Sequence, residues 1–338
     1  MQHEPYRELP GRVIETDERF KHVMAITLDP TARFERGVAR CITSREGDLV
    51  DGGALDHSEL RGIALDPAGR FAIGERLPIR HEKEMIASLT GRGDDFLGLE
   101  DPDIWIDDAA GLMHLYFTMP IFHGALTNHA HTRVHLGHAV GRDLMSLTMT
   151  LPVLTDSGQD GAKEVSIAPL NKEGYRFNLV ESSNTIDGMT YSVVRSAVAL
   201  EMGEPWEFGD VVFHPAEHGI PWIAGHASPG PLLPRDFIDV GAGKLLGVMN
   251  GREADTRKHD RIHHGLFSVG LFVYDYENGG IEWVSEQPLI RDSEARTITF
   301  ASQFVPGRKG EGTLYAHVDD SFVRAYALDA AALRPLIP

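Results

Sequence analysis

The stretch GLMHLYFT, residues 111–118, has a pattern that returns along the chain: a glycine turn, an apolar strand and a polar or acidic residue at the strand end. The pattern recurs as GYRFNLVE from residue 174, GKLLGVMNG from 243 and GTLYAHVDD from 312, at intervals of 63 to 69 residues. These intervals are close to one fifth of the 338 residues. Propellers have roughly four to eight four-stranded blades. The spacing therefore predicts an all-β protein, a five-bladed β-propeller.

Short apolar runs bounded by Asp, Gly and Pro turns continue from one end of the chain to the other and indicate strands. The runs expected as strands are 23–28, 62–65, 71–73, 112–121, 135–141, 175–182, 190–194, 245–250, 268–276, 313–318 and 322–328. No linker, low-complexity block or charge run divides them, so we expect a single domain over residues 1–338. A sandwich or a barrel is the alternative to the propeller.

The charge of the chain limits its partners. Fifty Asp and Glu residues against 32 Lys and Arg leave a formal net charge of -18, which repels phosphate backbones and anionic lipid surfaces. We therefore expect no nucleic acid and no membrane partner, while a homo-oligomer stays open. The N-terminus MQHEPYRELPGR lacks the features of a signal peptide, which predicts a cytoplasmic protein. The single cysteine, Cys41, is expected to be a small buried apolar residue in a reducing compartment.

The stretch GLEDPDIW, residues 98–105, places Glu100 and Asp101 at the entrance of a strand. A turn at 107–111 and the apolar run at 112–121 complete a hairpin with that strand. Pro102 keeps the entrance extended, because proline fixes φ and biases the preceding residue toward β. Two acids on a stiff strand entrance can supply a catalytic carboxylate and its neighbour. The alternative is an acidic turn in solvent.

Several motifs, in this order, resemble the five-bladed β-propeller glycosidases, and within them glycoside hydrolase family 130, whose members cleave or phosphorolyse β-mannosides. GLEDPDIW resembles the family's Gly-x-Glu-Asp-Pro-Arg motif, and AKEVSIAPLNKEGYRF, residues 162–177, resembles its Lys-Asp segment. GHASPGPLLP, residues 225–234, resembles the family's Gly-rich loop, and HHGLFSVGLFVYD, residues 263–275, its Tyr-x-x-Gly-x-x-Leu-x-Asp strand. GTLYAHVDDSFVRAYAL, residues 312–328, resembles the last blade.

Two departures from the family pattern concern charge. Asp103 stands where the family has Arg after Glu-Asp-Pro. Val180 and Glu181 stand where the phosphorylases carry a His-Arg pair that holds inorganic phosphate. Because a phosphate dianion needs charge-assisted donors, the loss of that pair favours hydrolysis over phosphorolysis.

The resemblance implies a catalytic role for Asp101, which aligns with the family's catalytic aspartate and is expected to be the proton donor. Hydrolysis of a glycoside needs one carboxylic acid to protonate the leaving oxygen and one carboxylate to activate water or attack the sugar. We expect Glu164 or Glu181 to be that second group. The family inverts configuration, which predicts carboxyl groups about 6.5–9.5 Å apart. The alternative for Glu181 is an ordinary strand-end acid in solvent.

Further polar residues at strand ends and in Gly/Pro-rich loops are candidates for binding sugar hydroxyls. The candidate substrate-binding residues are Glu100, Asp103, Lys163, His226, Asn250, Arg252, His264, Asp319 and Asp320. Asp319 and Asp320 form a like-charged pair, in which one pKa rises if both face a pocket. Their alternative is a solvated turn.

The histidines between His123 and His138 raise the question of a metal, since imidazole is a common zinc ligand and His129, His131 and His135 lie between them. On a strand, His135 and His138 face opposite sides, which argues against a shared ion. We expect no metal site and no cofactor. No P-loop or dinucleotide fingerprint and no G-x-S-x-G elbow is present in the sequence.

The sequence thus predicts an inverting glycoside hydrolase whose substrate is a small oligosaccharide, with a β-mannoside as the first candidate. A phosphorylase of the same family, an arabinofuranosidase or fructosidase-type propeller, and a carbohydrate-binding propeller without turnover are the competing hypotheses.

Overall fold

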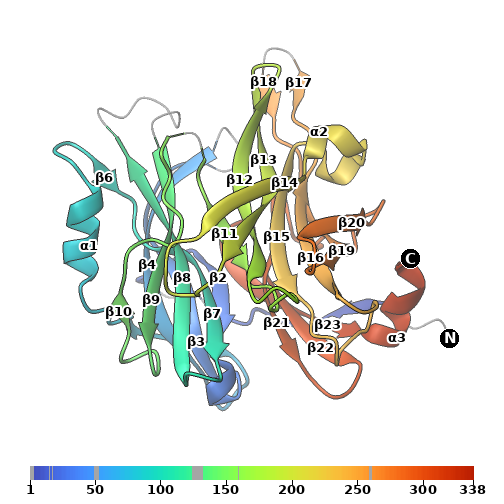
Figure 1. Cartoon of the computed structure of the whole chain (residues 1–338), viewed down its shortest axis with the longest axis horizontal. Coiled ribbons are helices and arrows are strands. Elements are labelled where there is room, and N and C mark those ends of the chain that lie inside the picture. The colour runs from blue at the N-terminus through green and yellow to red at the C-terminus, as the bar shows by residue number, and fades with distance from the viewer. Residues whose placement is uncertain are drawn as a thin grey trace.

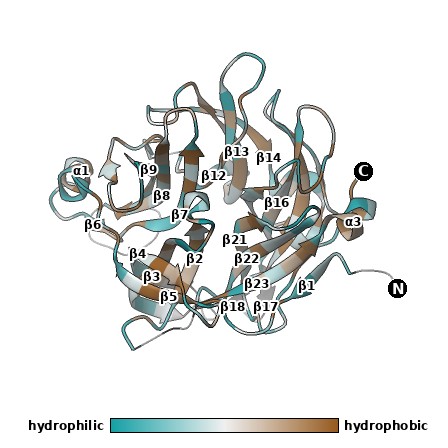
Figure 2. Ribbon diagram, turned by 90° about the horizontal axis from the view of Figure 1, so that it is seen from below, coloured by the Kyte–Doolittle hydropathy of each residue, from teal (hydrophilic) through white to brown (hydrophobic). Residues whose placement is uncertain are grey.

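Strands dominate the computed structural model, which describes residues 4–14, 16, 18–48, 53–123, 132–158, 160–258 and 261–338. Within this part of the chain, five antiparallel groups of four strands can be distinguished, and the third and fourth are joined into one sheet by a parallel pairing at Ser192 and His226. In Figure 1 their colours run from blue to red in that order, and Figure 2 shows the groups arranged around a centre, with β2, β7 and β21 close to it. The all-β prediction is confirmed.

Each group is a meander that begins with the strand nearest the centre. The first group is β2 (Val23–Leu28), β3 (Arg36–Asp48), β4 (Gly53–Leu65) and β5 (Phe71–Arg76). The second is β7 (Glu100–Asp107), β8 (Leu112–Phe122), β9 (Thr132–Gly141) and β10 (Thr148–Met149), with β6 (Asp95–Phe96) beside β8. The third is β11 (Lys163–Ser166), β12 (Arg176–Ile186), β13 (Met189–Ala199) and β14 (Glu207–Phe213).

The last two groups complete the series. The fourth is β15 (His226–Leu232), β16 (Lys244–Arg252), β19 (Phe267–Asp275) and β20 (Gly280–Val284). The fifth is β21 (Thr299–Pro306), β22 (Glu311–Val318), β23 (Phe322–Asp329) and β1 (Tyr6–Glu8). Because β1 comes from the N-terminus and pairs with β23 from the C-terminus, the two ends of the chain are joined in one sheet.

Shorter elements lie outside these groups. They are the hairpin β17 (Thr256–Lys258) with β18 (Arg261–His263), the helices α1 (Glu82–Leu89), α2 (Pro215–His218) and α3 (Ala330–Leu333), and 3-10 turns at Pro30–Ala32, Pro221–Ile223 and Arg334–Leu336. In Figure 2, α1 lies at the outer edge of the molecule and α3 lies near the C-terminus.

The first strands of the five groups contact one another in a closed series, β2 with β7, β7 with β11, β11 with β15, β15 with β21, and β21 with β2. Each of these strands has a break in its pairing register, as a β-bulge produces. The residues left unpaired at the breaks include Ala25, Asp101, Glu164, Gly230 and Ser302. The same irregularity therefore recurs around the centre.

Five large apolar clusters fill the spaces between successive groups. One cluster packs Leu115 and Phe117 of the second group against Val38 and Leu60 of the first. The others are built in the same way, and the cluster between the fifth and first groups contains the fully buried Cys41. Burial of apolar area at about 25 cal/mol per Å² is the main stabilising term at such contacts. The expectation that Cys41 is a buried apolar residue is confirmed.

The sequence predicted the middle strands of the groups better than the first strands. Of the middle strands, β8 and β23 contain the runs expected at 112–121 and 322–328, and the run expected at 175–182 begins one residue before β12. The first strand β2 matches the run expected at 23–28. The segment 225–234, expected as a Gly-rich loop, is instead largely strand β15. A β-bulge accommodates its Pro and Gly residues within the strand. Helix α1, which no sequence pattern indicated, has only one buried residue, Glu82.

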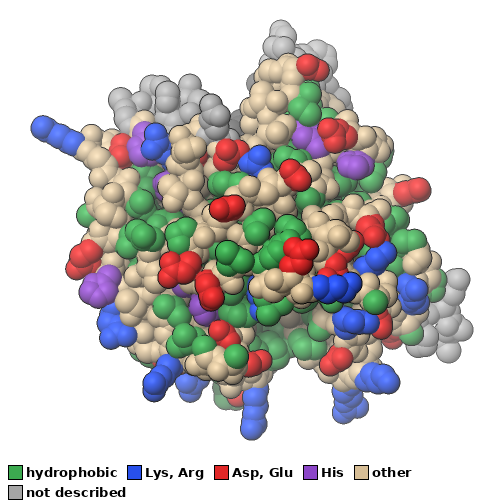
Figure 3. Space-filling model, in the orientation of Figure 1, with side chains coloured by type: hydrophobic (Ala, Val, Ile, Leu, Met, Phe, Trp, Pro, Cys, Tyr) green, Lys and Arg blue, Asp and Glu red, His purple; other side chains and the backbone are tan. Residues whose placement is uncertain are grey.

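The surface carries the acidic excess of the chain. Figure 3 shows Asp and Glu side chains scattered over one face, with Lys and Arg side chains toward its lower edge. Among the described residues, no helix has the length and apolar character needed to cross a bilayer.

Candidate active site

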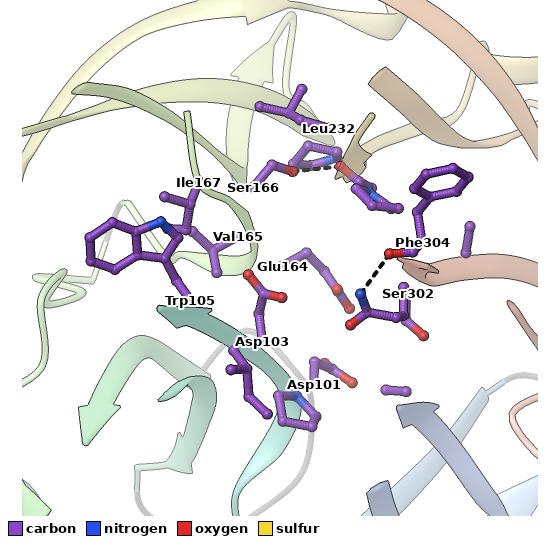
Figure 4. Close-up of a pocket in the computed structure, with 18 residues that line it drawn as sticks. Asp101, Asp103, Trp105, Glu164, Val165, Ser166, Ile167, Leu232, Ser302 and Phe304 are labelled. Atoms are coloured by element: carbon purple, nitrogen blue, oxygen red, sulfur yellow. Dashed lines mark hydrogen bonds between the residues drawn. The ribbon is translucent and has the colours of Figure 1, made fainter. Parts of the chain in front are cut away.

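Two cavities meet near the centre of the five groups. The larger has a volume of about 710 Å³, and we call it the entrance cavity; the starts of β7, β11 and β15 contribute to its wall. The smaller has about 170 Å³, and we call it the axial cavity; it is lined by the bulged segments of all five first strands (Figure 4). Asp101 and Glu164 belong to both walls, so these two acids stand where the cavities adjoin.

The backbone at both acids is unusual. Asp101 has φ = 46° and Glu164 has φ = 51°, in the left-handed region that non-glycine residues rarely adopt. Both residues are left unpaired at the bulges of their strands. Such bulges redirect side chains, and local strain of this kind concentrates at functional sites. The strand entrance predicted for GLEDPDIW is confirmed, and its bulge turns Asp101 toward the centre.

Arg40, in the middle of β3, holds the two acids of the Glu-Asp-Pro motif. Its Nη1 donates a hydrogen bond of 2.9 Å to Asp101 Oδ1, and its Nη2 donates one of 2.6 Å to Glu100 Oε1. Ser58 accepts a bond from Arg40 Nε and donates one to Glu100 Oε1. Although burial alone lowers the pKa of Arg40, Glu100 and Asp101 raise it above its ordinary value, so the guanidinium stays charged. The charged guanidinium therefore links Glu100 and Asp101.

Glu164 lies in a different environment. Burial and the nearby charge of Asp101 raise the pKa of its carboxyl well above the ordinary value, while Lys163 acts in the opposite direction. Both leading effects disfavour the carboxylate. Glu164, at the wall of both cavities, is thus driven toward its protonated form, which can donate a proton.

Glu181, on β12, lies behind the entrance cavity rather than on its wall. Its side chain is 2% exposed, and its Oε1 is 3.2 Å from Lys163 Nζ and 3.0 Å from His226 Nε2. Burial acts to raise the pKa of Glu181, but His226 and Lys163 more than offset it and hold the pKa below its ordinary range. Lys163 and His226 themselves reach the cavity. The alternative of a solvent-exposed acid at this position is wrong.

The entrance cavity is also lined by polar groups that carry their own partners. Arg252 and His264 line the entrance cavity and both bond to Asp255, His264 Nδ1 at 3.2 Å. Asp320 also lines the cavity, with its Oδ1 at 3.1 Å from His317 Nε2. Arg252, His264 and Asp320, all predicted substrate-binding residues, thus line one cavity.

Aromatic rings form one wall of the entrance cavity. Phe300 stacks on His317 with ring centres 5.1 Å apart and planes at 12°. Phe267 lies between Phe300 and His226, at 6.0 Å and 4.8 Å from their ring centres. The entrance cavity therefore offers an apolar aromatic surface as well as charged groups.

Four of the predicted binding residues lie outside the wall of the entrance cavity. Asn250 is fully buried and bridges β16 to β21 through two hydrogen bonds with the backbone of Ala301. The carboxylate of Asp319 accepts backbone N–H bonds of 2.8–3.1 Å from the segment 296–298, which forms part of the cavity rim. Asp103 lines the axial cavity, where burial raises its pKa to about 7. Glu100 remains beneath Arg40, and burial raises its pKa to about 7 despite that contact.

The histidines considered as metal ligands serve separate contacts. His138 Nε2 is 2.9 Å from His114 Nδ1, whereas His135 Nδ1 accepts a hydrogen bond from the backbone N–H of Asp156. His129 and His131 lie outside the described residues. In the part of the chain that the structure describes, no three His, Cys, Asp or Glu side chains converge in a way that could hold a metal ion.

Sequence reasoning missed Arg40, Asp255, Phe267, Phe300 and His317. Arg40 gave one usable signal, because it interrupts the apolar run GVARCI in the middle of a strand. The others gave none, since their contribution depends on which strands the fold brings to the centre.

Comparison of whole structures identifies similar folds. A member of the GH130 family of mannoside phosphorylases, a family that contains glycoside hydrolases targeting β-1,2-mannosidic linkages in Candida mannan, superposes with a TM-score of 0.67 at 16% identity, over 96% of this chain and 94% of the other. A glycosyl hydrolase from Bacteroides ovatus gives 0.61 at 16%, over 93% and 85%. The β-1,2-mannobiose phosphorylase from Listeria innocua gives 0.57 at 12%, over 98% and 90%.

Sequence comparison adds no closer relative, since no family model and no curated protein matches the chain. At these identities the similarity concerns the fold. The chain has the fold of the GH130 mannoside phosphorylases and glycoside hydrolases, as its motifs implied.

Proposed function

We propose that this chain is a five-bladed β-propeller glycoside hydrolase that cleaves a small β-mannoside oligosaccharide by an inverting mechanism with two carboxyl groups. The propeller rests on the five meanders, on the closed series of contacts between their first strands and on the fold similarity described above. Each meander is then one blade, and the two ends of the chain complete the last blade.

One observation carries the proposal: Asp101 and Glu164 lie on the first strands of neighbouring groups and line the same cavity. The electrostatics favour a division of roles that reverses the one implied by the motif. Glu164, whose pKa is raised, acts as the proton donor to the leaving oxygen. Asp101, bonded to Arg40, acts as the base that activates water. Glu181, which lies outside the cavity wall, orients Lys163 and His226 through its contacts with both.

The entrance cavity suits a carbohydrate. Its volume of about 710 Å³ lies within the range of roughly 300–1,000 Å³ found for small-ligand sites. The aromatic wall of Phe267 and Phe300 can pack against the C–H face of a sugar ring, while Lys163, Arg252 and Asp320 supply hydroxyl partners. A β-1,2-linked mannoside is the first candidate, because similar structures include a β-1,2-mannobiose phosphorylase bound to that disaccharide.

Hydrolysis is favoured by the pairing of the cations. Among the described residues that line the entrance cavity, each Lys, Arg and His has a carboxylate oxygen within 4.0 Å. A phosphate dianion must compete with these carboxylates for its donors, whereas a water molecule does not. A glycoside phosphorylase is the second candidate, because that activity is found on the same fold.

The test is to incubate the protein with β-1,2-mannobiose and with aryl β-glycosides, with and without inorganic phosphate, and to follow the products by proton NMR. We expect cleavage without phosphate, with α-mannose as the first product because inversion changes the anomer. Strict dependence on phosphate, with mannose 1-phosphate as the product, would contradict hydrolysis and support the phosphorylase. Sugar binding without cleavage would contradict both enzymes.

A further inference from the structure

The axial cavity lies next to the acids but has a different chemical character from the entrance cavity. Among the described residues that form its wall, the ionisable side chains are Asp101, Asp103 and Glu164, with no Lys, Arg or His. In Figure 4 these three acids lie within the same cavity. Ser166, Ser302 and Gln303 also line the wall, and the hydroxyls of the two serines donate to the backbone carbonyls of Gly230 and Ile26. This is a small polar chamber without a cation.

The size and charge of the chamber select its occupant. A volume of about 170 Å³ has room for several water molecules, since each takes roughly 30 Å³ in the liquid. An anion the size of phosphate meets three carboxyl groups there and no charge-assisted donor. Water can instead donate to the carboxylates and to backbone carbonyls. The chamber therefore suits water and rejects anions.

The direction of inverting attack gives this water a role. In an inverting hydrolysis, water attacks the anomeric carbon on the face opposite the leaving group. The leaving sugar of a bound oligosaccharide must extend toward the wide entrance cavity, because the axial cavity has about 170 Å³ against about 710 Å³. The opposite face of the reacting sugar then points to the axial side. Asp101 and Glu164 stand at this junction.

We propose that the axial cavity is the reservoir from which the attacking water reaches the anomeric carbon, a role that rests on the proposed function. Water gives one proton to Asp101 while its oxygen bonds to the anomeric carbon. The glycosidic bond breaks, and the leaving oxygen takes the proton of Glu164. Transfer of the proton from Asp101 back to Glu164 completes the cycle. The cation-free wall also explains how water is preferred over phosphate as the nucleophile.

Ser302 allows the reservoir to be filled without altering either acid. It occupies the bulge of β21, and its Oγ donates a 3.1 Å hydrogen bond to the carbonyl of Ile26. Ser302→Ala removes this bond and leaves the space, so it is the matched control. Ser302→Leu removes the same bond and fills the space. Ser302→Met, with a more adaptable side chain, serves as a second filling variant if the branched one misfolds.

The experiment measures kcat and KM of the folded variants with an aryl β-mannoside over a range of concentrations up to saturation, and high-resolution crystal structures record the ordered water. We expect Ser302→Ala to keep kcat within about twofold and the filling variants to lower kcat at least about tenfold with KM little changed, since ground-state binding is not altered. The cavity waters should be visible in the wild type and in Ser302→Ala and lost in the filling variants.

The outcomes separate the two proposals. Wild-type cleavage that the folded filling variants leave unchanged, or a dry axial cavity in the wild-type crystals, would overturn the reservoir and leave the glycosidase standing. Absence of any glycoside cleavage by the wild type would overturn the proposed function, and the reservoir with it.

Discussion

Glu164 and Glu181 lie on neighbouring strands of one sheet, β11 and β12, yet their surroundings drive ionisation in opposite directions. Glu181 is fully withdrawn from solvent and has Lys163 and His226 against its Oε1, which holds its pKa below the ordinary range. Glu164 has Asp101 as its second-largest influence after burial, and both raise its pKa. Burial acts to raise the pKa of both carboxyls, so the charges of the neighbouring groups account for the difference between them.

The different surroundings of Glu164 and Glu181 suit these two residues to different roles. A carboxyl that keeps its proton at a cavity wall can donate it, whereas a buried carboxylate with two basic neighbours serves to orient them. The sequence offered both residues as candidates for the second carboxyl group, with Glu181 at the position of the phosphorylases' phosphate site.

The largest expected effect is on turnover. Glu164→Gln should lower kcat on a disaccharide by about a thousandfold, within the roughly 10²–10⁴ range of general acid–base catalysis, because an amide cannot deliver the proton. Glu181→Gln should lower kcat far less and raise KM, since Lys163 and His226 lose their orientation. Steady-state kinetics on both variants check this, with the exposed Glu204→Gln as the control. Equal losses of kcat in Glu164→Gln and Glu181→Gln would contradict different roles for the two residues.

A smaller effect is expected on stability. Lys163→Met removes one partner of Glu181, and we expect a loss of about 2 kcal/mol in the free energy of unfolding, below the roughly 3–5 kcal/mol of a fully buried pair, since the Lys163 side chain is 41% exposed. In the double variant Lys163→Met/Glu181→Met the loss should shrink, because no buried charge is left unpaired. Urea unfolding of the two variants measures the coupling. A double variant less stable than the single one would contradict the account.

The pH dependence of stability should have opposite signs at the two sites. The folded protein keeps the proton of Glu164, which the unfolded chain loses near pH ~4.3. Relative to Glu164→Gln, the wild type should therefore lose about 1.4 kcal/mol per pH unit as pH rises above that value, until the folded-state pKa is passed.

For Glu181 the folded-state pKa is depressed, so its contribution to stability is present above pH ~4.3 and is lost as pH falls toward the folded-state value. Relative to Glu181→Gln, the wild type should therefore lose stability on acidification. Thermal unfolding of both pairs of proteins across pH gives the slopes. Slopes of the same sign would show that the two carboxyls are not in different states.

The smallest expected effect concerns the aromatic wall. Phe300→Leu keeps an apolar side chain but removes the flat face that stacks on His317, so KM should rise about fivefold, equivalent to roughly 1 kcal/mol, with kcat little changed. A fall in kcat with unchanged KM would instead place Phe300 in the chemical step.

The sequence predicts those strands that pack against neighbouring groups better than those that face the centre. The alternating apolar runs of the middle strands, such as β8 and β23, pack against neighbouring groups, and periodicity reveals them. The first strands β11 and β15 carry Lys, Glu, Pro and Gly because they face the centre, so no apolar pattern marks them. The spacing of the glycine turns indicated the five-fold repetition that local patterns did not.

The site was predictable where a short motif fixed it. Glu100, Asp101, Lys163 and Glu164 lie in motifs whose order in the chain indicated their importance, and they gather near the centre. Arg40 and Asp255 act through contacts with residues distant in sequence or across a loop; the only local signal is the interruption of an apolar run at Arg40, which does not name its partners. The protonation state of Glu164 was likewise beyond the sequence, because it depends on the position of Asp101 in the adjacent group.

The most direct test compares Asp101→Asn and Glu164→Gln on a series of aryl β-mannosides whose phenols differ in acidity. If Glu164 donates the proton, Glu164→Gln should act almost normally on the most acidic phenol and progressively worse on the others, whereas Asp101→Asn should lose the same factor on every substrate. The reverse pattern would contradict the assignment and restore Asp101 as the donor, and a loss independent of the leaving group in both variants would contradict proton donation by either.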